Sequence, residues 1–328
     1  MKNPPLLSIV VPVYNEEAVL LQCYRRLAEV SSDLDAEILF VDDGSRDHSA
    51  AILDGLAQRD PRVKVLLLTR NFGHQAAVTA GLHHACGQAV VVIDADLQDP
   101  PELITEFLRR WQQGYDVVYG IRTVRSGESW FKRASAHWFY RILRRLSDVD
   151  IPLDVGDFRL LSRPVVDVIN AMPEHHRFLR GMAAWTGFRQ TGVPYVRQPR
   201  AAGHSKYPWR RMWRLSVDAL TGFTVAPLRI GTRLALLVAV IAAIFSVWLI
   251  VQKMTHPANL VLGWTSLMVT VLWLGALQLG VIGMVGEYVG RIAEEARGRP
   301  LYVIGRTVNL EPAESIPPGR RSMPGSGR

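Results

Sequence analysis

Short runs of apolar, often β-branched residues alternate with amphipathic stretches along the first half of the chain. The runs predict strands at 7–13, 37–41, 63–68, 88–93 and 116–119, and the stretches between them predict helices at 16–30, 47–58, 74–85 and 101–113. Runs as continuous as 7–13 are typical of strands buried on both faces of a parallel sheet. Strand–helix alternation in turn implies right-handed crossover connections. The pattern therefore predicts an α/β fold with a mostly parallel sheet.

Polar residues directly follow three of these strands. They are Tyr14-Asn15-Glu16, Asp42-Asp43 and Asp94-Ala95-Asp96. Sheets of this kind bind ligands outside the carboxyl ends of their strands. We therefore expect three segments that are far apart in the sequence to converge on one site. Because neither G-x-G-x-x-G after the first strand nor G-x-x-x-x-G-K-[ST] occurs, a dinucleotide-binding fold and a P-loop are disfavoured.

The segment 90–101 (VVVIDADLQDPP) carries the most specific chemistry. The two-residue period of a strand predicts that Asp94 and Asp96 point to the same side, with Ala95 pointing away. Two carboxylates at a strand end suit a hard divalent cation, which takes oxygen ligands and keeps positions for substrate phosphates. The alternative is a pair of solvated acids at a strand end.

Two long runs in the second half of the chain contain no charged residue: 234–251 and 260–285. Each is long enough to cross, or nearly cross, a hydrocarbon core of roughly 30 Å. Arginines flank the pair on both sides, whereas the connector 252–259 carries only Lys253. The positive-inside rule therefore predicts a transmembrane hairpin with both chain termini in the cytoplasm. A buried helical hairpin in a soluble core is the alternative.

These patterns divide the chain into four parts. We expect a cytoplasmic catalytic domain at 1–200, a juxtamembrane amphipathic segment at 201–228, two transmembrane helices at 229–290 and a cytoplasmic tail at 291–328. Aromatic residues mix with arginines at 130–146 and 205–223, and the second of these segments suits a helix at the headgroup level. The tail contains a short β-prone segment at 301–304, and its composition from 311 onward predicts disorder.

The composition and charge of the chain bear on its cellular compartment and its binding partners. The chain has 328 residues, 48% of them hydrophobic, a net charge of +8 and two cysteines, which indicates a large core and a reducing compartment. The basic balance alone suggests nucleic-acid binding. Because no helix-turn-helix, RNA-binding or zinc-finger motif accompanies it, we expect no nucleic-acid partner.

Taken together, several motifs resemble those of the family 2 inverting glycosyltransferases with the GT-A fold, a Rossmann-like architecture. The motifs are VPVYNEE at 11–17, VDDGSRD at 41–47, RNFG at 70–73 and DADLQDPP at 94–101. Three further motifs resemble those of the polyprenyl-phosphate branch, and within it the bactoprenol glucosyltransferases: VGDFRLLSR at 155–163, MPE at 172–174 and GEYVGR at 286–291. The resemblance runs from residue 7 to about residue 308. The Q-x-x-R-W motif of processive synthases is absent, which favours transfer of a single sugar.

The resemblance implies a donor site for a nucleotide sugar, with UDP-glucose expected. Its implied binding residues are Pro12, Tyr14 and Glu16 at the uridine, Val41 and Asp43 at the base, Asp94 with Ala95 at the ribose or diphosphate, and Lys206 closing over the phosphates. Asp96 and Gln98 are the implied ligands of Mg²⁺ or Mn²⁺.

The resemblance also implies an acceptor site. Arg122 and Arg133 are expected to hold the acceptor phosphate, since an arginine fork matches phosphate geometry. Asp157 occupies the position of a carboxylate near the acceptor, where it would act as an orienting group or weak base. The alternative for Asp157 is a structural pairing with Arg159 or Arg163. Asp94, Asp96 and Asp157 are thus the candidate catalytic residues.

The implied reaction is inverting transfer of one sugar to undecaprenyl or another polyprenyl phosphate at the bacterial inner membrane. The resemblance also suggests a homo-oligomer, possibly a tetramer that exchanges strands after Pro300. Two alternatives stay open: another donor sugar, such as formamido-arabinose, an N-acetylhexosamine or mannose, and a non-catalytic membrane binder of nucleotide sugars.

Overall fold

The computed structural model describes residues 4–123, 155–175, 177–197 and 263–310, together with eight single positions between 238 and 255. The chain divides into two compact units. The first comprises Met1–Arg144, Val149–Pro208 and Gly298–Arg328, and the second comprises Arg145–Asp148 and Trp209–Arg297. Several predictions lie outside the described residues: the segments 130–146 and 201–228, Arg133 and Lys206.

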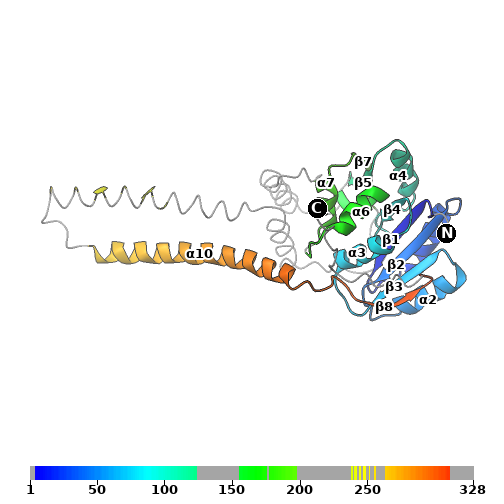
Figure 1. Cartoon of the computed structure of the whole chain (residues 1–328), viewed down its shortest axis with the longest axis horizontal. Helices are drawn as coiled ribbons and strands as arrows, with labels where there is room; N and C mark the ends of the chain where they lie inside the picture. Colours follow the sequence, from blue (N-terminus) through cyan, green and yellow to red (C-terminus); the bar gives the residue numbers. More distant parts are fainter. Residues whose placement is uncertain are drawn as a thin grey trace, which may run out of the picture. The chain divides into compact units, whose positions relative to one another are not determined.

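A single mixed sheet forms the centre of the first unit (Figure 1). Its order is β7-β5-β6-β4-β1-β2-β3-β8. The strands are β1 (Leu7–Val13), β2 (Ala36–Asp42), β3 (Val63–Leu68), β4 (Ala89–Val92), β5 (Val117–Arg122), β6 (Val155–Ser162), β7 (Gln190–Tyr195) and β8 (Ile304–Val308). β1 to β4 are mutually parallel, as predicted, whereas β6 is antiparallel to β4 and β5, and β8 is antiparallel to β3.

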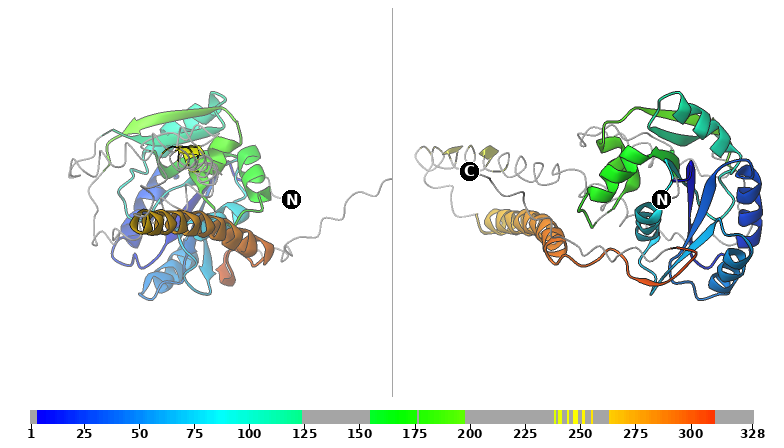
Figure 2. Two further views of the ribbon diagram at one scale, coloured as in Figure 1. Left: turned by 90° about the vertical axis from the view of Figure 1, so that its left-hand side faces the viewer. Right: turned by 45° about the vertical axis from the view of Figure 1, so that its right-hand side comes forward.

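Helices cover both faces of this sheet (Figure 2). One face is covered by α1 (Leu20–Val30), α2 (Ser49–Arg59) and α4 (Leu103–Gln112). The other face is covered by α3 (His74–His84), α6 (Arg163–Ala171) and α7 (Leu179–Trp185). The α/β class predicted from the alternation of strands and helices is therefore confirmed, with a mixed rather than purely parallel sheet.

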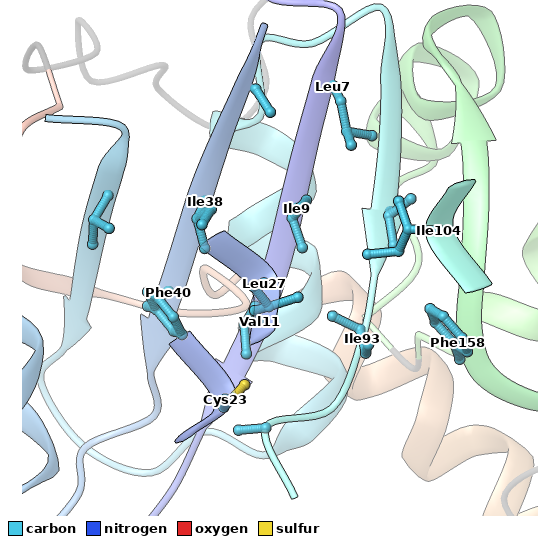
Figure 3. Close-up of a cluster of buried hydrophobic side chains, with 14 of the residues drawn as sticks. Leu7, Ile9, Val11, Cys23, Leu27, Ile38, Phe40, Ile93, Ile104 and Phe158 are labelled. Carbon is cyan, nitrogen blue, oxygen red and sulfur yellow. The ribbon is translucent and has the colours of Figure 1, made fainter. Parts of the chain in front are cut away.

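The core beneath α1 and α4 shows why the strand pattern is so apolar (Figure 3). Ile9 of β1 and Phe40 of β2 are fully buried against α1, which contributes Leu27. Phe107 of α4 stacks on Phe158 of β6 with ring centroids 4.7 Å apart. Burying aromatic and branched side chains of this size stabilises the fold by about 1.5–3 kcal/mol each, so this layer fixes the strand ends that carry the site.

Some boundaries differ from those predicted. The first helix begins at Leu20 instead of residue 16, because the amide of Val19 bonds the Glu16 carbonyl in a preceding turn. The helix predicted at 101–113 spans Leu103–Gln112, after a turn in which the Leu103 amide bonds Pro100. The fourth strand ends at Val92, before the carboxylates that were expected to continue it.

The chain returns to the sheet at its C-terminal end. The β-prone segment predicted at 301–304 leads into β8, whose first residue is Ile304. Arg306 pairs with Asp54 of α2 at 2.6 Å, and the Asn309 side chain donates to the carbonyls of Ala57 and Val63. Within this chain, β8 thus forms an edge strand on β3; strand exchange between subunits stays a prediction.

The long helix α10 (Trp264–Ala296) lies in the second unit and contains most of the second uncharged run. It continues six residues beyond the end at 290 that was predicted for the hairpin. Among the residues that the structure describes, no helix is both long and apolar enough to span a membrane.

Candidate functional site

The polar segments after β1, β2 and β4 lie together at the carboxyl ends of these strands, because the three strands are parallel neighbours in the sheet. Val13 is aligned with Asp42, and the amide of Ile93 bonds the carbonyl of Val10. The loop after β1 is joined to the loop after β2, since the Arg46 amide donates to the Asn15 side chain at 2.8 Å. The structure therefore places together the three segments that the sequence predicted to converge.

The segment after β1 combines buried backbone with an exposed ring. Pro12 is buried in β1 beside Val41, itself fully buried in β2, whereas Tyr14 is exposed. Asn15 adopts a left-handed conformation with φ 54°, which asparagine tolerates better than most residues. The amide of Glu16 donates to the hydroxyl of Ser49 at 3.0 Å. Tyr14 is thus the exposed residue of the segment, whereas Asn15 and Glu16 are half-buried.

Asp43, which was expected at the nucleotide base, contacts a neighbouring loop. Its two carboxylate oxygens accept the amides of Phe72 and Gly73 at 2.7 and 2.9 Å. Burial raises the pKa of the Asp43 carboxyl, although these two hydrogen bonds act to lower it. Next to it, Gly44 has φ 67°, and a β-carbon at this position would collide with the backbone of Arg70 and Asn71. The VDDG and RNFG motifs are thus two halves of one packed structure.

The carboxylates of the DADLQDPP motif follow β4 in a turn. Because β4 ends at Val92 and Leu97 has φ 59°, the two-residue strand period does not apply to Asp94 and Asp96, and the argument that placed them on the same side is wrong. Asp96 is buried and accepts the Gln98 amide at 3.1 Å, while Asp94 and Gln98 are half-buried. Within the described ranges, no group of three or more His, Cys, Asp or Glu side chains has the arrangement of a metal site.

A charged cluster on the α3 and α7 face contains residues that the sequence analysis did not assign. His74, the first residue of α3, places Nε2 3.3 Å from Oδ2 of Asp157 and 3.7 Å from Oδ1 of Asp94. Arg180 of α7 donates its Nε to the other oxygen of Asp157 at 2.8 Å. Gln75 is a third neighbour of Asp157, at 3.4 Å. Three helix-borne side chains therefore contact one carboxylate of β6.

The charges of this cluster shift one another's pKa values. Loss of water around the His74 ring lowers its pKa, but the Asp157 hydrogen bond and the charges of Asp94 and Asp157 outweigh that loss and raise the pKa to about 9. Burial raises the pKa of Asp157, but Arg180 and His74 hold it well below its usual range. At neutral pH the cluster is therefore an ionised carboxylate held between two cations, and Asp157 is a weak base.

The alternative partners expected for Asp157 have other contacts. Arg159 is buried and donates to the carbonyl of Gly156 at 2.9 Å, whereas Arg163 donates to the carbonyls of Ala85 and Gly87. Within the described part of the chain, Asp157 instead forms its ion pairs with His74 and Arg180.

Arg122, expected at the acceptor phosphate, ends β5 beside a second buried acid. Tyr195 donates its hydroxyl to Asp99, which is 1% exposed, and Arg122 donates to the Tyr195 oxygen at 3.3 Å. The guanidinium of Arg122 also packs over Gly156, where a β-carbon would come within 2.5 Å of Nη2. Arg122 is therefore fixed over Gly156, on the opposite face of β6 from the Asp157 side chain, because successive strand residues point to opposite faces.

His74 and Arg180 were not predicted from the sequence, for one common reason. His74 follows the RNFG motif, and Arg180 lies in a short helix that no strong periodicity marks. Their importance depends on contacts between segments far apart in the chain. The one usable sequence signal is a histidine that immediately follows a recognised motif.

Comparisons with known proteins agree with this architecture. The family model "Glycosyl transferase family 2" matches residues 8–169. The "Uncharacterized glycosyltransferase YkcC" of Bacillus subtilis is 46% identical over 93% of this chain and 94% of its own length. The "Prophage bactoprenol glucosyl transferase homolog" of Escherichia coli is 42% identical over 92% of this chain and 98% of its own length, and the "SfII prophage-derived bactoprenol glucosyl transferase" of Shigella flexneri is likewise 42% identical over 92% and 98%.

Among solved structures, that of glucosyl-3-phosphoglycerate synthase from Mycobacterium tuberculosis, in complex with Mn²⁺, UDP-glucose and phosphoglyceric acid, is 19% identical. It covers 66% of this chain and 78% of that chain at a TM-score of 0.43, a likeness too weak to support inference. The sequence relatives establish the family, because they are 42–46% identical to this chain over nearly its full length. The chain belongs to glycosyltransferase family 2, and it is a glycosyltransferase.

Proposed function

We propose that this enzyme transfers one glucosyl residue from UDP-glucose to a polyprenyl phosphate such as undecaprenyl phosphate. The observation that carries the proposal is the 42% identity, over 92% of the chain, to proteins named as bactoprenol glucosyl transferases. The site supports it chemically, because strand-end carboxylates lie beside a cluster of histidine and arginine side chains. Such a site suits two phosphorylated substrates, one neutralised by a cation and the other by protein side chains.

The donor half of the site is formed by the turn after β4. Asp96 and Gln98 offer carboxylate and amide oxygens, and Asp94 lies close by with its carboxylate half-buried. This donor set fits Mg²⁺ or Mn²⁺, which are held by one or two carboxylates and completed by substrate phosphates. When bound, such a cation offsets the negative charge of the departing diphosphate.

The reaction needs little proton transfer. A phosphate monoester with a second pKa near 6 is largely ionised at pH 7, so its oxygen is already a nucleophile. That oxygen forms a bond to the anomeric carbon while the bond from this carbon to the UDP oxygen breaks, which inverts the configuration. The protein has to hold the two phosphates in line, and this accords with an Asp157 that is too weakly basic to take up a proton.

The acceptor supports a location at a membrane surface. A polyprenyl tail resides in the bilayer, and the arginines that flank the uncharged runs 234–251 and 260–285 favour the cytoplasmic face. We therefore propose that the catalytic unit works at the cytoplasmic side of the bacterial inner membrane.

The decisive experiment is transfer by the purified chain in detergent. Undecaprenyl phosphate is offered with a panel of radiolabelled nucleotide sugars, each with and without EDTA, and labelled lipid is measured. Labelling from UDP-glucose alone, abolished by EDTA, is the expected result. Labelling from a different donor would replace glucose and keep the reaction. If no donor labels the lipid although UDP still binds, the chain is a nucleotide-sugar binder and the proposed reaction is wrong.

A further inference from the structure

Asp99 is a buried carboxylate with two arginines and a tyrosine around it. Tyr195 of β7 donates its hydroxyl to Oδ1 of Asp99. Nη2 of Arg122, the last residue of β5, lies 3.8 Å from Oδ2, and Nε of Arg197, two residues beyond β7, lies 3.5 Å from Oδ1. The arginine side chains are 23% and 29% exposed, whereas that of Asp99 is 1% exposed. One buried acid therefore fixes two cations that solvent can reach.

Two glycines make room for these side chains. A β-carbon at Gly120 would come within 2.6 Å of the Tyr195 ring, and one at Gly156 would come within 2.5 Å of the Arg122 guanidinium. Burial and the charge of Asp99 raise the pKa of Tyr195 to about 12, so its hydroxyl stays protonated at neutral pH. The same hydroxyl accepts Nε of Arg122 at 3.3 Å. Arg122 is therefore held by packing and by one hydrogen bond.

Both arginines keep most of their N–H donors. In the pair of Arg26 with Glu102, three hydrogen bonds measure 2.7, 2.9 and 3.0 Å. Arg122 and Arg197 are farther from Asp99, at distances where charges attract but hydrogen bonding is weak. Among the described residues, Oδ2 of Asp99 and Nε of Arg197 have no hydrogen-bond partner. Because a guanidinium has five N–H donors, both groups retain donors for a ligand, and their combined charge exceeds that of the acid they share.

The DADLQDPP motif joins this group to the donor half of the site. Asp99 directly follows Gln98 and is three residues from Asp96, and these two residues are the expected ligands of the cation. One short segment thus carries both the expected cation ligands and the acid that holds the two arginines. A phosphate monoester is an anion whose charge and oxygen geometry match a pair of guanidinium forks.

We propose that Arg197 binds the phosphate monoester of the acceptor together with Arg122, and that Asp99 and Tyr195 are positioning residues that fix the two guanidinium groups. This inference rests on the proposed function, because it takes the acceptor to be a polyprenyl phosphate and adopts the role expected for Arg122. It adds an arginine that no motif predicted. It also gives the third acid of the DADLQDPP motif a task other than binding the cation.

The test is steady-state kinetics of the full chain with geranyl phosphate as a short acceptor. We expect Arg197→Gln to raise the KM for geranyl phosphate by about tenfold or more, through the loss of a charge-assisted contact. The KM for UDP-glucose and the Kd for UDP should stay within about twofold of wild type. Arg197→Lys keeps the charge without the fork and should fall between wild type and Arg197→Gln. Asp99→Asn should raise the same KM more than it lowers kcat.

The matched control is Arg189→Gln, at the opposite end of β7 from Arg197. Arg189 directly precedes the strand, is exposed and packs over the Tyr115 ring at 5.1 Å. Its variant should leave both KM values unchanged. Retained UDP binding shows that each variant is folded, and Arg197→Lys is the variant to use should Arg197→Gln fail to fold. A merely structural Arg197 would lower the Tm without changing the KM for geranyl phosphate.

Two kinetic outcomes overturn the assignment: an unchanged KM for geranyl phosphate in Arg197→Gln, or an increase confined to UDP-glucose, which would place Arg197 at the donor diphosphate. A second readout needs no turnover. Geranyl phosphate should raise the Tm of the wild type and of Arg189→Gln more than geraniol does, and Arg197→Gln should lose that difference. If the wild type transfers no sugar, the proposed function fails, but this pattern of Tm values would still support the phosphate site. A wild type without the difference, or an Arg197→Gln variant that keeps it, would refute the site.

Discussion

Replacing Gly44 with alanine tests whether the VDDG and RNFG motifs form one packed unit. Gly44 has φ 67°, a conformation that residues with a side chain rarely adopt. A β-carbon there would lie 2.5 Å from the carbonyl carbon of Arg70 and 2.7 Å from the amide nitrogen of Asn71. Both neighbours are backbone atoms, so relief requires the loop itself to move. That loop is held by the Asp43 carboxylate through the amides of Phe72 and Gly73.

The expected cost follows from these two effects. The left-handed conformation costs an alanine about 1–2 kcal/mol. Forcing the loop apart adds about 1–3 kcal/mol, the usual range for overpacking. Together they lower the free energy of unfolding by about 2–5 kcal/mol, which lowers the urea midpoint by about 1–2 M for an m-value near the upper part of its usual range.

Gly55→Ala is the matched control, because the same atom is added in the middle of α2 with no neighbour within 4 Å. It should raise stability by about 0.5–1 kcal/mol through helix propensity alone. The assay is urea unfolding of the purified chain followed by far-UV circular dichroism. A Gly44→Ala midpoint equal to that of the wild type would show that the two motifs are not packed against each other as described.

Three further predictions concern the site. Asp157→Asn should make the free energy of unfolding less dependent on pH in acid, because the depressed pKa of Asp157 gives the wild type a stabilising contribution that is present above about pH 4 and lost below it. The urea midpoints of variant and wild type should therefore converge as the pH falls towards 3, and a constant gap between them would contradict this reasoning. Tyr195→Phe removes the hydroxyl that lies between Asp99 and Arg122. Thermal unfolding should show a loss of about 1–3 kcal/mol in stability, and kinetics should show a higher KM for the acceptor. Wild-type values in both assays would show that the hydroxyl does not position Arg122. EDTA should abolish transfer and excess Mn²⁺ should restore it, measured as labelled lipid, and full activity in EDTA would exclude the divalent cation.

The central sheet was predictable because its strands are marked by local composition. The apolar runs at β1 and β3 were predicted with the boundaries found, since strands buried on both faces have no polar alternation to obscure them. β6 was missed as a strand because Asp157 and Arg159 interrupt its apolar pattern. β7 contains Gly192 and Pro194, both unfavourable in strands, and its place beside β5 depends on tertiary pairing.

The candidate site was predictable only in part, for a similar reason. The acids after β4 are neighbours in sequence, so a motif reveals them. The contacts of Asp157 with His74 and Arg180 join β6 to α3 and α7, and a single sequence contains no record of such distances. The strand rule failed at Asp94 and Asp96 because it assumed that β4 continues, whereas a left-handed Leu97 closes a turn there.

The edge position of β8 has a consequence for the order in which the protein is made. β3 ends at Leu68, and its partner begins at Ile304, so 235 residues lie between the two strands. At a synthesis rate of about 5–20 residues per second, roughly 12–47 seconds pass after translation of β3 before β8 exists. During that interval β3 is the open edge of a nascent sheet, ready to pair with a strand of another chain. A ribosome that stalls within the second unit therefore leaves a nascent chain that is prone to aggregate through β3.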